Sequence, residues 1–420
     1  MIIQKAFTRA SLIARLEAGP LGSYLADLEA ALCERHYATE TMQKCLHAAD
    51  AFGRWLITQK IELRMVDEKI VSQYVDGLER RVIHNRHCVP SHFATGLHHL
   101  LNVLRRQGVI GPRREVAPET PIEIFLAQYK HYLEAVLGSA PATLSKHMLF
   151  AKRLLAFAFK SQTLDWQSLN GADITQFVIQ QTERRSGSSR KALAHSVRVL
   201  LRYLVGRGDI QPGLAASVPK VRAWKHAYLP EYLSEAEIAQ ILAACDLETA
   251  MGKRNYAILL LLSRLGLRAC EVVSLRINDI DWVSGTITIR SNKTHRERRL
   301  PLSQEVGQAL IEYLRYGRPK GNVHREIFLT QDAPCSPFRD STAVGGIVRR
   351  EMKRADIVQR STRAHLFRHT AATQMVRRGA SFKDIADVLG HQSLQTTAIY
   401  AKLDLANLSQ VALPWPGGSQ

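Results

Sequence analysis

Cysteine is scarce in this chain, and its spacing argues against two kinds of fold. Zinc ribbons need closely paired thiolates, and small disulfide-stapled folds need a dense set of cysteines. No two cysteines here form a C-x-x-C pair, and the six are scattered: Cys33, Cys45, Cys88, Cys245, Cys270 and Cys335. The sequence therefore predicts a protein of a reducing compartment that has neither a zinc ribbon nor a disulfide framework.

Long apolar segments are also missing. The longest apolar run, from Ala257 to Leu262, is far shorter than the roughly 20 residues that a membrane helix needs. The first nineteen residues, MIIQKAFTRASLIARLEAG, carry charges throughout and lack the apolar core of a signal peptide. The phosphate-binding pattern G-x-x-x-x-G-K-[ST] is absent. We expect a soluble cytoplasmic protein that has no membrane partner and no nucleotide cofactor.

Acidic residues are too few to balance the basic ones. The 420 residues include 57 Lys and Arg against 38 Asp and Glu, which gives a formal net charge of +19. Such an excess attracts polyanions, and nucleic acid is the usual one. A solvated basic surface is the alternative interpretation of charge alone.

Two segments rich in proline and charge interrupt the helical patterning. The first is 111–121 (GPRREVAPETP), and the second is 218–230 (VPKVRAWKHAYLP). Such segments are typical of linkers. They predict three blocks, at 1–112, 120–218 and 230–403, followed by a tail at 404–420.

The first two blocks resemble each other. Leu101, Leu104, Gly108, Ile110 and Pro112 recur with the same spacing as Leu201, Leu204, Gly208, Ile210 and Pro212. Each block reads as four or five amphipathic helices, because apolar residues recur at three-to-four spacing. Duplication is one explanation; the general similarity of helical bundles is the other.

Basic residues gather on the last helices of both blocks and in the second linker. A run of charged residues is often only a solvent-exposed helix face, but the recurrence of such runs in a strongly basic chain favours contact with phosphates. The candidate DNA-binding residues are Arg105, Arg106, Arg184, Arg185, Arg190, Lys191, Arg198, Arg202, Lys220, Arg222 and Lys225.

The third block changes character. Ser234 and Glu237 form a capping box that predicts a helix start, and an apolar helix is expected over 255–263. The stretches 286–290 and 298–302 flank a polar turn and predict a β-hairpin. Further helices are expected from about Gln304, Ala343, His365 and Phe382, and a short one ends near Tyr400. The predicted fold class is mainly α, with two helical domains before a mixed α+β domain that contains a small antiparallel sheet.

Four short motifs in this block carry chemistry. Arg268 follows a glycine turn, and Glu271 lies one helical turn further on, close enough to hold its guanidinium. Lys293 stands in the hairpin turn, where an ammonium group reaches either a cleft or solvent. Taken singly, these residues are most simply read as surface groups.

The other two motifs are HLFRHT at 365–370 and the segment from Leu389 to Tyr400 (LGHQSLQTTAIY). His365 and His369 have the spacing of zinc ligands on a helix, but no glutamate follows the first and Arg368 would repel a metal. We therefore expect no metal. An Arg beside a His favours a phosphate oxygen instead.

Together, the motifs GLRACEV, a hairpin lysine before R-x-L-P-L, HLFRHTAAT and LGHQSLQTTAIYA resemble the tyrosine recombinase (phage integrase) family. The resemblance covers 230–403 strongly and 120–218 more weakly, as the family's helical core-binding domain. It implies that Tyr400 is the nucleophile, that Arg268, Lys293, His365, Arg368 and His391 are catalytic, and that Glu271 supports Arg268. It further implies cleavage of DNA through a 3′-phosphotyrosyl bond, without metal or ATP.

The chemistry suits these residue types. Attack on a phosphodiester builds negative charge on its oxygens, and two guanidiniums can clamp them. A phenol with a pKa of about 10 needs a base near neutral pH, and the leaving 5′ oxygen needs an acid. His365 and His391 can hydrogen-bond the phosphate oxygens or help to take the tyrosine proton, and Lys293 suits the role of the acid.

The family's partners are recombination sites in double-stranded DNA, bound by a dimer at each site and a tetramer in synapsis, in some cases with partner recombinases. The tail residues Leu405, Leu408 and Val411 would dock on a neighbouring subunit or on their own domain. The block 1–112 is additional, as in a transposon-borne member with long recognition sites. The alternative functions are relaxation of supercoils, as in type IB topoisomerases, and non-catalytic DNA binding.

Overall fold

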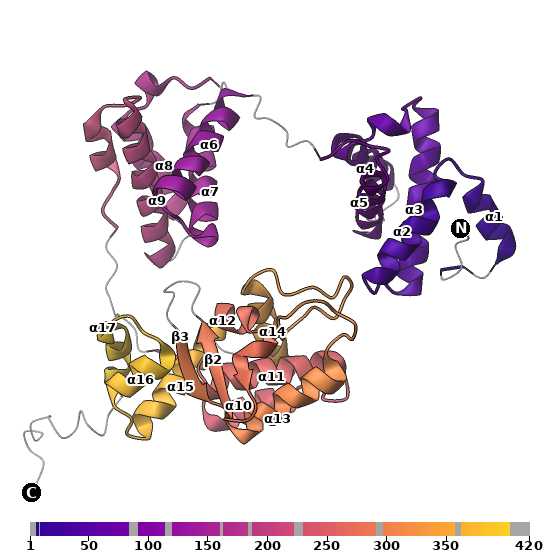
Figure 1. Cartoon of the computed structure of the whole chain (residues 1–420). Helices are drawn as coiled ribbons and strands as arrows, with labels where there is room; N and C mark the ends of the chain where they lie inside the picture. Colours follow the sequence, from indigo (N-terminus) through magenta and orange to yellow (C-terminus); the bar gives the residue numbers. More distant parts are fainter. Residues whose placement is uncertain are drawn as a thin grey trace, which may run out of the picture. The chain divides into compact units, whose positions relative to one another are not determined.

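The computed structural model describes residues 6–7, 9–83, 91–113, 120–159, 163–183, 187–221, 230–290, 297–357 and 363–403. The chain forms two compact units, one of residues 115–228 and one of residues 1–114 together with 229–420. Figure 1 shows the helices and strands of the chain, coloured along the sequence. Within the second unit, the N-terminal residues have a hydrophobic core of their own, which runs from Ala6 to Ile110. The division into three domains thus stays a proposal, and the separate cores support it. In the described part of the chain, no helix is long and apolar enough to span a bilayer.

The N-terminal block is helical. Its helices are α1 (Ala10–Glu17), α2 (Gly22–Glu34), α3 (Thr39–Thr58), α4 (Glu68–Ile83) and α5 (Ser91–Arg106), with a short 3₁₀ turn η1 (Leu63–Met65). Fully buried leucines from α2, α3 and α5, such as Leu28, Leu46 and Leu101, meet in its core. The apolar spacing that predicts these helices is therefore the spacing that fills the core.

The middle block repeats the order of helices from α2 to α5, with no counterpart of α1 among its described residues. Its α-helices are α6 (Pro121–His131), α7 (Pro141–Ala158), α8 (Gly171–Thr182) and α9 (Gly187–Arg207). A π-turn η2 (Tyr132–Val136) follows α6, and the 3₁₀ turns η3 (Trp166–Ser168) and η4 (Pro212–Ser217) precede α8 and follow α9. A glycine with positive φ follows the end of α5 and of α9, +70° at Gly108 and +80° at Gly208, a conformation that glycine tolerates best. The matched order is what a duplication would produce, and duplication remains our proposal.

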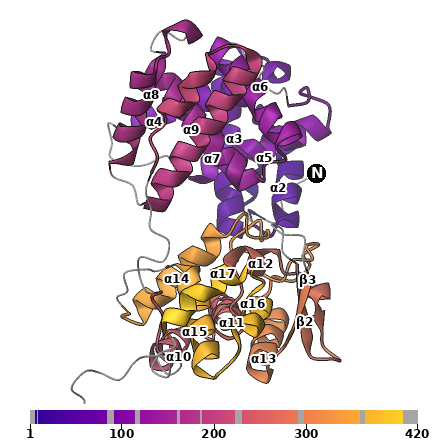
Figure 2. The same ribbon diagram turned by 90° about the vertical axis from the view of Figure 1, so that its left-hand side faces the viewer.

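The C-terminal block is built around one buried helix, α11 (Ala250–Arg264). Its residues from Ala257 to Ser263 are inaccessible to solvent, and the helices α10, α12, α13, α14 and α15 pack around it (Figure 2). The surrounding elements are α10 (Glu235–Ala243), α12 (Ala269–Ser274), η5 (Ile277–Asp279), α13 (Gln304–Glu312), a π-turn η6 (Tyr313–Gly317), α14 (Thr342–Arg354) and α15 (Ala364–Arg377). The capping box predicted at Ser234 is confirmed, since its hydroxyl accepts from the Glu237 amide. The apolar helix is longer at its N-terminus than predicted, because Thr249 caps it one turn earlier.

A small antiparallel sheet lies beside these helices. Its strands are β1 (Ile280–Asp281), β2 (Thr286–Arg290) and β3 (Glu297–Pro301), in the order β1-β2-β3. Ile287 pairs with Leu300 and Ile289 with Arg298, so the isoleucines of β2 and Leu300 face the core. The predicted hairpin is confirmed, with β3 one residue earlier than expected, and β1 is an addition. The predicted fold class is therefore correct.

The chain closes with α16 (Phe382–Leu389), α17 (Leu394–Thr397) and the 3₁₀ turn η7 (Ala398–Leu403). These elements and α15 enclose a second small core formed by Ala372, Val376, Ile385, Leu389 and Tyr400. Gly390 ends α16 in the left-handed conformation, at φ +63°, and so turns the chain toward His391. The predicted docking tail at 404–420 lies outside the described residues.

Candidate active site

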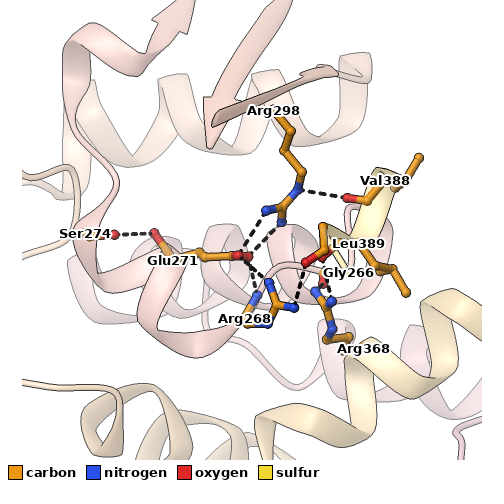
Figure 3. A network of polar contacts seen from close by, with 9 residues as sticks. Gly266, Arg268, Glu271, Ser274, Arg298, Arg368, Val388 and Leu389 are labelled. Atoms are coloured by element: carbon orange, nitrogen blue, oxygen red, sulfur yellow. Dashed lines mark hydrogen bonds and ion pairs between the residues drawn. The ribbon is translucent and has the colours of Figure 1, made fainter. Parts of the chain in front are cut away.

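Three arginines converge on the C-terminus of α16 (Figure 3). Arg298 Nε donates to the Val388 carbonyl at 2.9 Å, and Arg368 Nη2 to the Leu389 carbonyl at 2.6 Å. Arg268 Nη2 donates to the Gly390 carbonyl at 3.0 Å. The last carbonyls of a helix have no partner within it and lie at its negative end. Because these carbonyls bind three separate guanidiniums, the end of α16 brings together side chains that lie far apart in sequence.

Glu271 holds two of these arginines (Figure 3). Its carboxylate accepts from Arg268 Nη1 at 2.8 Å and from both terminal nitrogens of Arg298, at 3.0 and 2.8 Å. It also accepts from the Arg268 amide at 2.9 Å, which caps α12. Burial alone would raise the pKa of Glu271, but the hydrogen bonds and charges of Arg298 and Arg268 outweigh burial and lower it. The predicted contact between Glu271 and Arg268 is therefore present. It belongs to a larger ion-pair network, because Glu271 also binds Arg298 of β3.

Arg368 is the most deeply buried of the three cations. It comes from the first turns of α15, is 4% exposed, and donates to the Gly266 carbonyl at 2.7 Å as well as to Leu389. Burial, and then the charge of Arg268, lowers its pKa to about 10. Arg368 therefore keeps its charge at neutral pH, and its planar group is held at two points.

Two predicted histidines, His365 and His391, lie close to Arg268 and Arg368. His391 directly follows the Gly390 turn, and its Nδ1 lies 2.7 Å from the hydroxyl of Thr397 on α17. Burial, and then the charges of Arg368 and Arg268, lowers its pKa to about 4. The same causes lower the pKa of His365, although its side chain stays exposed. Both imidazoles are therefore neutral at physiological pH and can donate a hydrogen bond to an anion or accept a proton.

Tyr400 lies in the small C-terminal core. The residue is 2% exposed, and burial raises the pKa of its phenol, although Arg368 and Arg268 act in the opposite direction. Its hydroxyl lies 2.8 Å from Nδ1 of His369. The phenol is thus within electrostatic reach of both guanidiniums, and His369 contacts the oxygen that is predicted to react.

The predicted DNA-binding residues differ in their exposure to solvent. Arg106, Arg190, Lys191, Arg202 and Lys220 are exposed. Arg105 forms an ion pair with Glu68 at 2.8 Å, and Arg198 donates to the carbonyls of Val218 and Pro219 at 3.0 and 2.9 Å. Lys293, Arg184, Arg185, Arg222 and Lys225 lie outside the described residues.

The sequence patterns assign no role to two residues of the site. Arg298 is the arginine of the R-x-L-P-L motif, and its position in a strand next to the predicted hairpin lysine was the only signal. His369 stands next to Arg368, and its spacing from His365 pointed only to a metal ligand. Neither contact can be read from spacing, because Arg298 and Glu271 are 27 residues apart and His369 and Tyr400 are 31 apart.

The arrangement suits chemistry at one backbone phosphate. Arg268 and Arg368 supply fixed positive charge, and neutral imidazoles stand beside them. A buried phenol close to this cluster can act as a nucleophile once its proton has an acceptor. The cluster therefore has groups to neutralise an anionic transition state and a side chain to bond to phosphorus.

Comparison with known proteins decides the family. Residues 231–406 match the phage integrase family. A Sinorhizobium fredii protein that bears the name integrase/recombinase y4rA is 34% identical over 97% of this chain and 98% of its own length. Tyrosine recombinase XerC of Lacticaseibacillus casei is 27% identical over 67% of this chain and 95% of its own. The chain belongs to the phage integrase family, the tyrosine recombinases.

Solved structures show the same fold at low sequence identity. XerH site-specific recombinase, in a post-cleavage complex with its difH substrate, has a TM-score of 0.55 at 18% identity, covering 69% of this chain and 84% of XerH. Lambda integrase residues 75–356, a dimer bound to a COC′ core site, has a TM-score of 0.53 at 16% identity, covering 66% of this chain and 94% of the integrase. The y4rA protein, in contrast, matches this tyrosine recombinase over almost its whole length, the N-terminal block included.

Replacing Arg298 of this tyrosine recombinase by Met should disturb the site although Arg298 is no predicted catalytic group. The change removes two donors to the buried Glu271 and one to Val388, so we expect the free energy of unfolding to fall by about 3 kcal/mol. Loosening of Arg268 and of the turn before His391 should slow DNA cleavage by about tenfold or more. Chemical denaturation and single-turnover cleavage would measure the two effects.

The matched control is Arg299→Met on the same strand, whose side chain is exposed. It removes an equal charge and should change stability by less than about 0.5 kcal/mol. Equal effects of the two substitutions would mean that the positive charge on the hairpin, rather than the ion-pair network around Glu271, accounts for the lost stability and cleavage.

Proposed function

We propose that this tyrosine recombinase, an enzyme that cuts and rejoins double-stranded DNA at specific sites, forms a 3′-phosphotyrosyl bond through Tyr400. The observation that carries the proposal is the gathering of Arg268 and Arg368 at the end of α16, within electrostatic reach of the buried phenol. In this reaction the guanidiniums bind the non-bridging oxygens of the scissile phosphate, and His365 and His391 donate further hydrogen bonds.

The two chemical steps conserve energy. Tyr400 attacks phosphorus and the 5′ oxygen leaves, with Lys293 of the hairpin turn as the proposed acid. The phosphotyrosyl ester retains the energy of the broken backbone bond, so the 5′ hydroxyl of another strand can restore the backbone without ATP. Glu271 takes no part in bond making; it orients Arg268 through the 2.8 Å ion pair.

Rejoining to a second strand requires two DNA sites, so we propose that the chain acts as a dimer at each site and a tetramer in synapsis. Lambda integrase, which is a dimer on its COC′ core site, supports the first of these. The tail at 404–420 would then couple subunits. Integration, excision or transposition of a mobile element is the proposed biological role, and the Tn1549 transposon integrase in complex with transposon end DNA, 17% or less identical in the structures compared, illustrates one such setting.

A substrate with a nick close to the scissile phosphate tests the proposal. After cleavage, the short fragment that carries the free 5′ hydroxyl diffuses away and cannot be rejoined. The covalent complex therefore accumulates and is visible on a denaturing gel. We expect the wild type to form this complex on its cognate site; failure to form any would favour a non-catalytic DNA-binding role. A two-site recombination assay beside a supercoil relaxation assay separates a recombinase from a topoisomerase.

The middle block offers a surface for the DNA backbone. Lys191, Arg198 and Lys220 line a shallow groove between α9 and the end of η4. Basic side chains along a groove suit a row of phosphates. We propose that this face and the second linker hold the duplex, as in the core-binding domain of the family.

The N-terminal block is proposed as a second DNA-binding unit. The order of its helices α2 to α5 matches that of α6 to α9, and Arg106 lies exposed at the end of α5. Deleting 1–112 should shorten the DNase footprint and reduce the salt dependence of binding, because each lost phosphate contact lowers the slope of log K against log salt by about 0.9. An unchanged footprint and slope would show that this block does not contact DNA.

A further inference from the structure

His369 contacts the nucleophile directly. Its Nδ1 lies 2.8 Å from the Tyr400 hydroxyl, and the two ring centroids are 5.7 Å apart. The Tyr400 residue is 2% exposed and His369 is half-buried, so the contact is partly shielded from water. The predicted catalytic set does not include His369, and the contact therefore requires its own explanation.

The surroundings of His369 keep its imidazole neutral. His365 and Arg368 face it from its own helix α15, His391 from the turn after α16, and Tyr400 from η7. Burial, followed by the influence of His365 and the charge of Arg368, lowers the pKa of His369 to about 4. A neutral imidazole has one nitrogen that accepts. When Nδ1 is that nitrogen, the phenol donates to it.

The other two histidines are placed for a different task. Nδ1 of His391 is bound to the Thr397 hydroxyl at 2.7 Å, which leaves its Nε2 for another partner. His365 is exposed and lies in the first turn of α15. Of these three imidazoles, the 2.8 Å contact with the phenol belongs to His369.

We propose that His369 is the catalytic base that accepts the proton of Tyr400, an inference that rests on the proposed function. In cleavage the Oη–H bond breaks, its proton binds Nδ1, and Oη bonds to phosphorus as the bond to the 5′ oxygen breaks. The 5′ oxygen takes a proton from a separate acid. In rejoining, the incoming 5′ hydroxyl returns its proton to that acid group as its oxygen bonds to phosphorus, the Oη–P bond breaks, and His369 returns its proton to Tyr400.

The phosphate itself strengthens this base. An anion bound between Arg268 and Arg368 offsets the positive charge that opposes protonation of the neighbouring imidazoles. His369 thus becomes a better proton acceptor when the substrate arrives. Without DNA, the same group holds the phenol neutral and buried.

The test measures covalent complex formation on the nicked substrate in single turnover between pH 6 and 9. The wild type should show a nearly flat rate over this range. His369→Asn keeps a polar side chain but cannot take the proton, so we expect it to be roughly 100-fold slower at pH 7. Its rate should rise about tenfold per pH unit, because the phenol must then ionise unaided. Arg377→Gln, on the same helix but bound to Tyr232, is the control and should behave as the wild type.

A substrate with sulfur in place of the bridging 5′ oxygen separates the two proton transfers. A thiolate leaves without an acid, because a thiol has a far lower pKa than an alcohol. This substrate should restore a Lys293→Ala variant and leave His369→Asn slow. Restoration of His369→Asn would overturn the proposal, since the lost group would then act on the leaving oxygen.

Other outcomes are equally decisive. A His369→Asn variant that cleaves as fast as the wild type, or faster, would show that the contact only holds the phenol down. Should the variant not fold, as judged by thermal unfolding, the wild-type profile still decides, because a rate that climbs tenfold per pH unit would exclude a base with a lowered pKa. Absence of any covalent complex with the wild type would instead reject the proposed function.

Discussion

A Tyr400→Phe variant should bind its recombination site normally and form no covalent complex with it. The substitution removes one oxygen and keeps the ring that packs against Val376 and Leu389. Loss of a nucleophile should reduce cleavage by roughly 10⁴-fold or more, below detection on a nicked substrate. The half-buried imidazole of His369 loses its hydrogen-bond partner, so the free energy of unfolding should fall by only about 1 kcal/mol.

Gel-shift titration and denaturing gels measure binding and cleavage on the same DNA. Normal binding with no covalent complex is the predicted pair of results. Residual cleavage at more than a trace would mean that another group attacks the phosphate, and loss of binding as well would mean that the substitution acts through folding.

The second large effect is expected from Arg368→Lys. The guanidinium donates to the carbonyls of Gly266 and Leu389 with two separate nitrogens, and a lysine ammonium cannot reproduce this planar geometry. The charge remains, so DNA affinity should change little. The phosphate carries its greatest negative charge in the transition state, and the lysine cannot bind it there as the guanidinium does. Cleavage should therefore fall by about 10²- to 10³-fold.

Single-turnover rates at saturating protein separate this effect from binding. Arg377→Lys, further along α15 and exposed, is the control. A change in affinity that accounts for the whole loss would contradict the assignment of Arg368 to the transition state.

The regular elements around the site were largely predictable. The alternation of isoleucine and threonine gave β2 its bounds, and the capping box at Ser234 marked the start of α10. The strand β1, two residues long, has no pattern of its own and forms only because Ile280 pairs with Ile287. Local patterns thus specify elements that are long enough to show a period.

The arrangement of the site was less accessible. Its organising feature is the C-terminus of α16, where three backbone carbonyls accept from three arginines. Carbonyls are present at every position and leave no mark in the sequence. Gly390 is a feature of the sequence that reflects this arrangement. The φ of Gly390 is positive, and a Cβ at that position would lie 2.8 Å from Nη1 of Arg298.

The roles of Arg298 and His369 depend on tertiary contacts for the same reason. Each stands inside a motif, Arg298 in R-x-L-P-L and His369 in HLFRHT, and each acts on a residue from a distant segment. His365 and His369 have the spacing of zinc ligands, an interpretation that the neighbouring Arg368 argues against, and the contact that His369 makes is with Tyr400.

The covalent link itself provides the most direct test of this mechanism. The complex trapped on a nicked site can be digested with protease and nuclease, and the nucleotide-bearing peptide identified by mass spectrometry. We predict a single modified peptide, with the 3′ phosphate of the DNA attached to the phenolic oxygen of Tyr400. Attachment to any other residue, or through a 5′ phosphate, would contradict the mechanism.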